Sequence, residues 1–126
     1  MAKKILVIDD EELVTESLKK LLSKSGYEVQ IARSGTEAVE RVKATDFDLI
    51  VSDIRMPDMD GVQALTKIRE YLKEEGKPAM PEILITGYAS KENLEGAKNL
   101  GVADYLYKPF NIRDFLEIVK KNLENK

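Results

Sequence analysis

The amino-acid sequence predicts an α/β domain, a doubly wound five-stranded parallel sheet with helices on both faces. Three observations predict it. Short apolar runs alternate five times with segments of helical periodicity. The length of 126 residues suits one domain. The hydrophobic fraction of 43% and the charged fraction of 34% are typical of a globular protein. Repeated strand-then-helix units give parallel strands, because each helix crosses back over the sheet before the next strand begins.

Each predicted strand is a short apolar run bounded by polar or turn-forming residues. In order, the runs cover residues 5–8, 27–31, 49–51, 83–85 and 105–107. The first run is continuous, as expected of a strand buried on both faces. In the second run Tyr27, Val29 and Ile31 alternate with polar residues, which indicates an edge or half-covered strand.

The predicted helices follow the strands in turn. Their apolar positions, expected to face the core, are Leu13, Val14, Leu18, Leu21 and Leu22; Ala38, Val39 and Val42; Val62, Leu65, Ile68 and Leu72; Leu94, Ala97 and Leu100; and Phe115, Ile118, Val119 and Leu123. Ser34 with Glu37 forms a capping-box pattern at the second helix, and Ser90 and Asn111 are the predicted caps of the last two. Glycines at 26, 76 and 101 mark helix ends, and residues 74–81 are expected to form an extended loop.

Composition excludes several classes of function. The net charge of −3 and the pI of about 5.2 argue against nucleic acid as a direct partner. The sequence has no cysteine and no histidine, so it lacks disulfides, thiol chemistry, the usual zinc ligands and any phosphohistidine of its own. No apolar run approaches a membrane span, and Asp9 and Asp10 interrupt the first apolar run before it resembles a signal peptide. We therefore expect a cytoplasmic protein that does not bind membranes.

Polar residues end four of the five predicted strands. Asp9 and Asp10 follow the first strand, Asp53 the third, Thr86 the fourth and Lys108 the fifth. In open α/β sheets, sites form beyond the carboxyl ends of the strands, so these side chains are expected to converge. Each has an ordinary alternative when taken alone: a helix cap, a turn residue, a β-branched strand residue and a surface charge. Their joint occurrence favours a site.

The charges of this cluster indicate a metal. Three carboxylates against one ammonium leave a formal charge of −2, which one divalent cation balances. Ligation by oxygen alone suits Mg²⁺. Asp53 is then a candidate carboxylate nucleophile toward phosphorus, with Lys108 and Thr86 placed to meet the phosphoryl oxygens. No separate base is needed, because a carboxylate is already ionised at neutral pH.

Four segments resemble the motif blocks of response-regulator receiver domains from two-component signalling systems: KILVIDDEE, LIVSDIRMPDMDG, EILITGYAS and ADYLYKPF. The similarity extends from Lys4 to about Leu123. The resemblance implies a flavodoxin-like fold like that of the chemotaxis receiver, with strand order 2-1-3-4-5. It also implies that residues 1–126 form a single receiver domain with no output domain, either native or cut from a longer regulator.

The resemblance assigns roles to individual residues. It makes Asp53 the phospho-acceptor, with Asp10 and Asp53 ligating Mg²⁺ directly and Asp9 ligating it through water. The backbone carbonyl of Arg55 completes the protein ligands. The remaining assignments are Lys108 as the partner of the phosphoryl group, Thr86 and Tyr105 as the switch pair, and Pro109 as a proline preceded by a cis peptide bond. Core packing is the alternative role for Tyr105.

The resemblance also implies partners. A sensor histidine kinase or phosphotransfer protein would supply the phosphoryl group from a phosphohistidine. Phosphorylation would then shift the face built from the fourth helix, the fifth strand and the fifth helix, which would contact a downstream protein target or form a homodimer. The chain would catalyse its own phosphorylation and slow dephosphorylation without turning over an external substrate. Arg55 and Tyr88 either flank the phosphoryl group and hinder an attacking water, or point to solvent.

Three other functions are the alternatives to this interpretation. A phosphatase of the haloacid-dehalogenase type would need a second acid two residues after Asp53, where Arg55 stands. A flavin carrier would need a Ser/Thr/Gly-rich loop after the first strand, where the sequence is Asp-Asp-Glu-Glu. A degenerate receiver acting only as a binding module would lack acceptor residues, and all of them are present.

Overall fold

The computed structural model describes residues 2–56, 58–87 and 91–124. In these residues, five strands alternate with five helices. The strands are β1 (Lys4–Ile8), β2 (Glu28–Ala32), β3 (Leu49–Asp53), β4 (Glu82–Thr86) and β5 (Asp104–Tyr107). The helices are α1 (Glu12–Lys24), α2 (Gly35–Ala44), α3 (Gly61–Glu74), α4 (Lys91–Leu100) and α5 (Ile112–Glu124). Each apolar run in the sequence therefore forms a strand, and each strand is followed by a helix.

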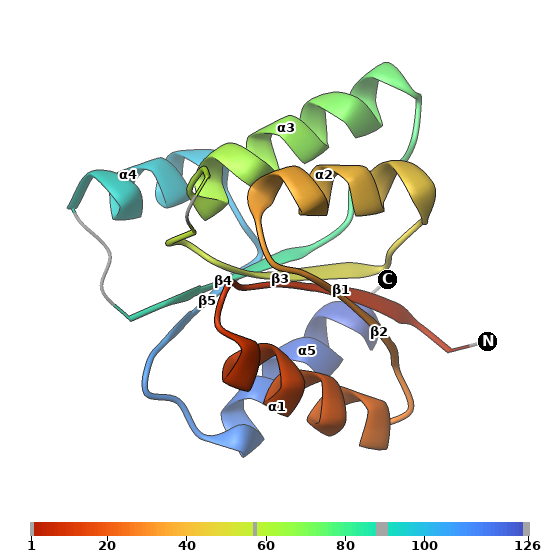
Figure 1. The fold of residues 1–126 in the computed structure, drawn as a ribbon, viewed down its shortest axis with the longest axis vertical. Coiled ribbons are helices and arrows are strands. Elements are labelled where there is room, and N and C mark those ends of the chain that lie inside the picture. Colours follow the sequence, from red (N-terminus) through yellow and green to blue (C-terminus); the bar gives the residue numbers. More distant parts are fainter. Residues whose placement is uncertain (1, 57, 88–90, 125–126) are drawn as a thin grey trace.

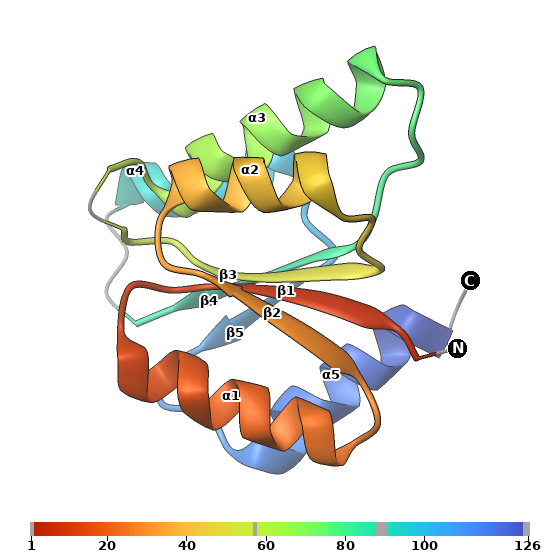
Figure 2. The same ribbon diagram turned by 45° about the vertical axis from the view of Figure 1, so that its right-hand side comes forward.

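The sheet has the order β2-β1-β3-β4-β5, and every neighbouring pair is parallel. Figures 1 and 2 show α2, α3 and α4 on one face of the sheet and α1 and α5 on the other. This arrangement confirms the doubly wound prediction and its strand order. Because all strands run the same way, their carboxyl ends lie along one edge of the sheet, where the predicted site residues begin.

The sheet is buried on both faces, as the continuous apolar runs predict. Successive residues of β1 point to opposite sides: Leu6 and Ile8 join the core beneath α2, α3 and α4, whereas Ile5 and Val7 join the core beneath α1 and α5. Strand β2 lies at one edge and is only half-buried along most of its length. Its alternating pattern was correctly interpreted as an edge strand.

Helix α1 departs from the predicted core positions. Leu13 was expected to face the core, but its side chain is 84% exposed. The buried residues of α1 are Thr15, Leu18 and Leu22, which share one face of the helix. Thr15 is polar, so it does not belong to the apolar pattern; its hydroxyl donates to the carbonyl of Glu12 at 3.0 Å. The face centred on Thr15 leaves Leu13 on the solvent side.

The helix starts confirm part of the capping pattern. The Ser34 hydroxyl accepts from the backbone N–H of Glu37 at 3.1 Å, but the Glu37 carboxylate accepts from Arg33 N–H at 3.3 Å instead of completing a box. The complete capping box is at α3, between Asp60 and Gln63. Asn111 caps α5 by accepting from the N–H of residue 114 at 2.7 Å. The predicted cap Ser90 lies outside the described residues.

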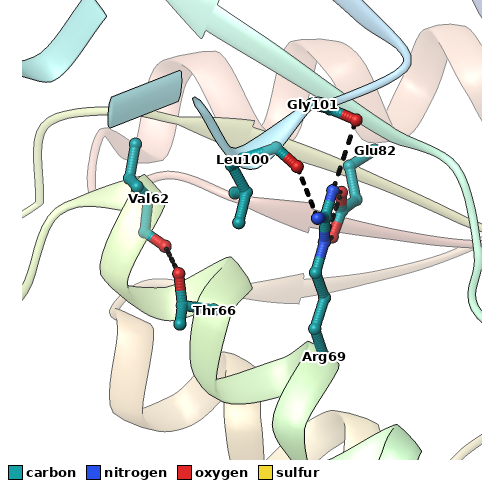
Figure 3. Close-up of polar contacts among 6 residues, drawn as sticks. All are labelled: Val62, Thr66, Arg69, Glu82, Leu100 and Gly101. Atoms are coloured by element: carbon teal, nitrogen blue, oxygen red, sulfur yellow. Dashed lines mark hydrogen bonds and ion pairs between the residues drawn. The ribbon is translucent and has the colours of Figure 1, made fainter. Parts of the chain in front are cut away.

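An ion pair between the partly exposed Arg69 and the buried Glu82 joins α3, β4 and the end of α4. Glu82, the first residue of β4, is 3% exposed, and Nε of Arg69 donates to both of its carboxylate oxygens at 3.0 and 3.1 Å. The same guanidinium donates to the carbonyl oxygen of Leu100 at 2.5 Å (Figure 3). Arg69 therefore satisfies both a buried carboxylate and a carbonyl at the end of α4, where helix carbonyls lack partners within the helix.

No helix within the described ranges is both long and apolar enough to cross a membrane.

Candidate functional site

A cavity of about 430 Å³ lies at the carboxyl edge of the sheet. Its lining residues are Asp10, Glu11, Asp53, Arg55, Met56, Gly87 and Lys108. They come from the carboxyl end of β3 and from the segments that follow β1, β3, β4 and β5, which the parallel sheet brings to one edge. Of the strand-end residues that the sequence singled out, the structure brings Asp10, Asp53 and Lys108 together in this cavity.

Three carboxylates form the acidic part of the site. One oxygen each from Asp9, Asp10 and Asp53 lies within 4.8 Å of the others. Asp9 and Asp53 are buried, whereas Asp10 is exposed on the cavity wall. This set of hard oxygen donors, part buried and part open to water, fits Mg²⁺, which takes a few carboxylates and keeps several waters.

Lys108 connects the fifth strand to the acidic cluster. Its Nζ lies 3.2 Å from Oδ2 of Asp53 and 3.8 Å from Oδ2 of Asp9. Burial alone would lower the pKa of Lys108, but the charges of Asp53 and Asp9 outweigh it and raise this pKa above its ordinary value. Lys108 is therefore a fixed positive charge beside the Asp53 carboxylate.

Asp9 is the carboxyl group of the cluster whose pKa is raised. Its side chain is 2% exposed, and burial, with a smaller contribution from the charge of Asp53, raises its pKa to about 6. A hydrogen bond from the N–H of Glu11 to Oδ1 at 3.0 Å and the charge of Lys108 oppose this rise without cancelling it. The sequence predicts an excess of negative charge at this site. The structure agrees, because the raised pKa means that Asp9 is harder to ionise than an ordinary aspartate.

The two switch candidates differ in burial: Thr86 is buried, whereas Tyr105 is half-buried. Thr86 is 3% exposed and ends β4 just before Gly87, a cavity residue, but it does not itself line the cavity. Tyr105 is half-buried and packs against the core cluster beneath α2, α3 and α4. It pairs with Leu84 on the neighbouring strand, two residues before Thr86. Thr86 therefore lies two positions beyond the strand neighbour of Tyr105, on the same face of β4 as Leu84.

The loop after β3 supplies the remaining predicted residues. Arg55 is exposed and lines the cavity, and its backbone N–H donates to Oδ1 of Asp53 at 3.4 Å. Tyr88, the other residue expected to flank a phosphoryl group, lies outside the described residues. The Lys108–Pro109 peptide bond is cis, as the family resemblance implies.

Sequence reasoning missed three cavity residues: Glu11, Met56 and Gly87. Glu11 and Gly87 each directly follow a residue predicted to belong to the site, so adjacency was a usable signal. Met56 lies in the turn after Asp53, and its residue type carries no indication of a polar site.

The fold and the site together define a class. A flavodoxin-like sheet with clustered aspartates and a lysine at its carboxyl edge is the framework of a receiver-type domain. The sequence model of the response regulator receiver domain matches residues 5–120, and the chain belongs to this family.

Similar proteins include longer regulators. The chain is 36% identical over 121 residues to the transcriptional regulatory protein CrdR of Helicobacter pylori, covering 96% of this chain and 55% of that protein. It is 37% identical over 119 residues to the transcriptional regulatory protein ZraR of Escherichia coli K12, covering 94% of this chain and 26% of that protein. The chain thus spans about half of one relative and about a quarter of the other.

Solved structures agree with the fold. A CheY-like response regulator receiver domain protein from Methanospirillum hungatei JF-1 superposes with a TM-score of 0.89 at 37% identity, covering 98% of this chain and 95% of that one. The chemotaxis protein CheY4 of Vibrio cholerae gives a TM-score of 0.86 at 29% identity, covering 98% of this chain and all of that one.

Proposed function

We propose that this receiver domain is a switch activated by phosphorylation of Asp53. The phosphoryl group comes from a phosphohistidine of a sensor histidine kinase or phosphotransfer protein. The observation that carries the proposal is the position of the Asp53 carboxylate, which shares the acidic cluster and has the Lys108 ammonium 3.2 Å from Oδ2. A carboxylate oxygen, a positive charge and a group of candidate metal ligands at one cavity support the proposal.

The chemistry is a transfer between two nucleophiles. A carboxylate oxygen of Asp53 forms a bond to phosphorus while the N–P bond of the phosphohistidine breaks, and the released imidazole takes up a proton from water. Lys108 stays beside the phosphoryl oxygens and offsets their charge. Asp10, Asp53 and the Arg55 carbonyl would hold Mg²⁺, with Asp9 acting through water. Bound Mg²⁺ supplies neutralisation of the charge shared by the carboxylate and the phosphoryl group.

The switch begins where Thr86 meets the site. An acyl phosphate on Asp53 carries more negative charge than the carboxylate and offers new acceptor oxygens. The hydroxyl of Thr86 turns toward them, which opens space for Tyr105 to rotate inward. Support comes from the burial of Thr86 beside Gly87 and from the half-buried position of Tyr105. The α4–β5–α5 face then changes shape for a downstream target or a homodimer.

A surface for the phosphodonor adjoins the site. An apolar groove of about 370 Å³ runs between α1 and residues 110–112. Leu13, 84% exposed, begins the groove two residues after the cavity residue Glu11, and Ile112, 62% exposed, borders its other side. Exposed apolar side chains next to a reactive centre favour protein docking. We assign this groove to the sensor histidine kinase or phosphotransfer protein.

The proposal is tested by intact mass after incubation with Mg²⁺ and a small acyl phosphate. We expect the wild type to gain one phosphoryl group and Asp53→Asn to gain none. Asp46→Asn is the matched control, because Asp46 is an exposed aspartate far from the cavity that pairs with Lys77 at 3.1 Å. Equal phosphorylation of Asp53→Asn would overturn the assignment.

The same incubation separates the other functions. Release of many phosphates per chain on the time scale of the reaction would indicate a phosphatase, whereas we expect one phosphoryl group and slow loss. Arg55, exposed on the cavity wall, occupies the place where a dehalogenase-type acid would stand. A wild type that stays unmodified would indicate a binding module.

A further inference from the structure

The loop between β3 and α3 contributes residues to the wall of the cavity. Arg55 and Met56 line the cavity, and the Arg55 carbonyl is the proposed metal ligand of this loop. The loop closes at its base, where Gly61 N–H donates to the Ile54 carbonyl at 2.6 Å. A Cβ on Gly61 would collide with the backbone carbonyl oxygen of Asp53, so the start of α3 lies directly against the acceptor residue. The base of the loop is thereby fixed.

The far part of the loop is held from outside by α2. Oδ1 of Asp58 accepts from the N–H of Gly35 at 3.0 Å, and Oδ2 accepts from the N–H of Thr36 at 2.9 Å and from its hydroxyl at 2.5 Å. These hydrogen bonds, led by the Thr36 hydroxyl, lower the pKa of Asp58 to about 2. Asp58 therefore remains an anion at neutral pH, docked on N–H groups that have no partner within the helix.

An apolar contact reinforces this docking. The Met59 side chain packs over Gly35 so closely that a Cβ at that position would collide with it. Gly35 is also buried at the first position of α2. Asp58 and Met59 are neighbours in the loop, and both contact the first turn of α2. The charged contact and the apolar contact together hold this part of the loop against α2.

We propose that Asp58 is a positioning residue for the metal site, an inference that rests on the proposed function. It does not line the cavity, but it fixes the loop so that the Arg55 carbonyl meets the cation beside Asp53. Mg²⁺ requires near-octahedral geometry at short ligand distances, so a displaced carbonyl weakens binding. Once the metal is saturating, it holds the carbonyl itself, and the chemical step is unchanged.

The test measures the Kd for Mg²⁺ by calorimetry and the phosphorylation rate at saturating Mg²⁺. For Asp58→Ala we expect a Kd about tenfold higher, the low end for residues that support a metal ligand, and a rate within about twofold of the wild type. Thr36→Val, which removes one of the three donors, should raise the Kd by about threefold. Asp58→Asn keeps one acceptor oxygen and should lie between the wild type and Asp58→Ala.

The control is Asp46→Ala, which removes the same charge from an exposed aspartate beyond the end of α2. A general loss of negative charge would weaken Mg²⁺ equally in Asp46→Ala and Asp58→Ala, and that result would overturn the inference. If Asp58→Ala does not fold, Asp58→Asn and Thr36→Val carry the test, and a wild-type Kd in both overturns it. A wild type that neither binds Mg²⁺ nor accepts phosphate would instead contradict the proposed function.

Discussion

Two buried carboxylates lie at opposite ends of the strands of the same sheet, and they differ in how completely their charge is neutralised. Asp9, at the carboxyl end of β1, is 2% exposed, and Glu82, at the amino end of β4, is 3% exposed. Glu82 receives hydrogen bonds from the Arg69 guanidinium on both of its oxygens. Asp9 accepts one backbone N–H and has the Lys108 ammonium at 3.8 Å, shared with Asp53.

The difference separates a structural charge from a functional one. A fork-shaped guanidinium can satisfy both oxygens of one carboxylate, so the Glu82 end is locally complete (Figure 3). At the carboxyl edge, one lysine faces three aspartates, and the pKa of Asp9 is raised to about 6. A buried charge that is incompletely neutralised raises the free energy of the folded state. Such a charge at the carboxyl edge of the sheet indicates a site where a cation would bind.

The largest expected effect on stability comes from removing Arg69 from its ion pair with Glu82. In Arg69→Met, Glu82 stays buried without its partner, so we expect the free energy of unfolding to fall by about 3 kcal/mol, the low end for a buried pair because the Arg69 side chain is 37% exposed. Urea denaturation at neutral pH measures this change. Phosphorylation of the folded fraction should persist, because Arg69 binds Glu82 at the amino end of β4, whereas Asp53 lies at the carboxyl end of β3.

The matched control for that change is the double variant Arg69→Met/Glu82→Leu. Replacing both members of a buried ion pair by apolar residues is often close to neutral, so we expect stability within about 1 kcal/mol of the wild type. A double variant as unstable as Arg69→Met would show that the loss comes from packing of the arginine stem rather than from an unpaired Glu82.

The next effect is the pH dependence that Asp9 produces when the metal is chelated. Its folded pKa of about 6 exceeds the ordinary 3.8, so the folded state binds the proton more tightly than the unfolded chain. This contribution to stability is full below about pH 4 and is lost as the pH rises through about 6. The total change is at most about 3 kcal/mol. Asp9→Asn removes it.

We therefore expect the stability of Asp9→Asn relative to the wild type to increase between about pH 4 and pH 7 in EDTA, by urea denaturation at each pH. Asp58→Asn should show the opposite sign in a lower window, because the lowered pKa of Asp58 stabilises the folded state above about pH 4 and that stability is lost as the pH falls toward about 2. A pH-independent difference for Asp9→Asn would mean that Asp9 is ionised in the folded protein.

The sequence predicted most of the sheet and the acidic part of the site for one physical reason. Strands buried on both faces must be continuous apolar runs, so the polar residue that ends each run is easily found, as with Asp9 and Asp53. Parallel topology then brings these ends together without any knowledge of side-chain contacts.

Other features depend on contacts that a linear pattern does not contain. Leu13 fits a helical repeat but faces solvent, because the buried face of α1 is centred on Thr15. The pairing of Arg69 with Glu82 joins residues 13 positions apart on different elements, and nothing in either local pattern indicates it. Asp58 was interpreted only as turn chemistry, because its contacts with Gly35 and Thr36 cross 22 or more residues of sequence.

The central claim is that the carboxyl edge lacks one divalent cation's worth of positive charge, and Mg²⁺ titration of the unfolding free energy tests it most directly. At a Mg²⁺ concentration about 100 times the Kd, we expect a gain of about 2.7 kcal/mol in the wild type and in the control Asp46→Asn. At that same concentration, Asp10→Asn, which removes a proposed ligand, should gain much less. Stability that does not change with Mg²⁺, or that rises equally in Asp10→Asn, would contradict the claim.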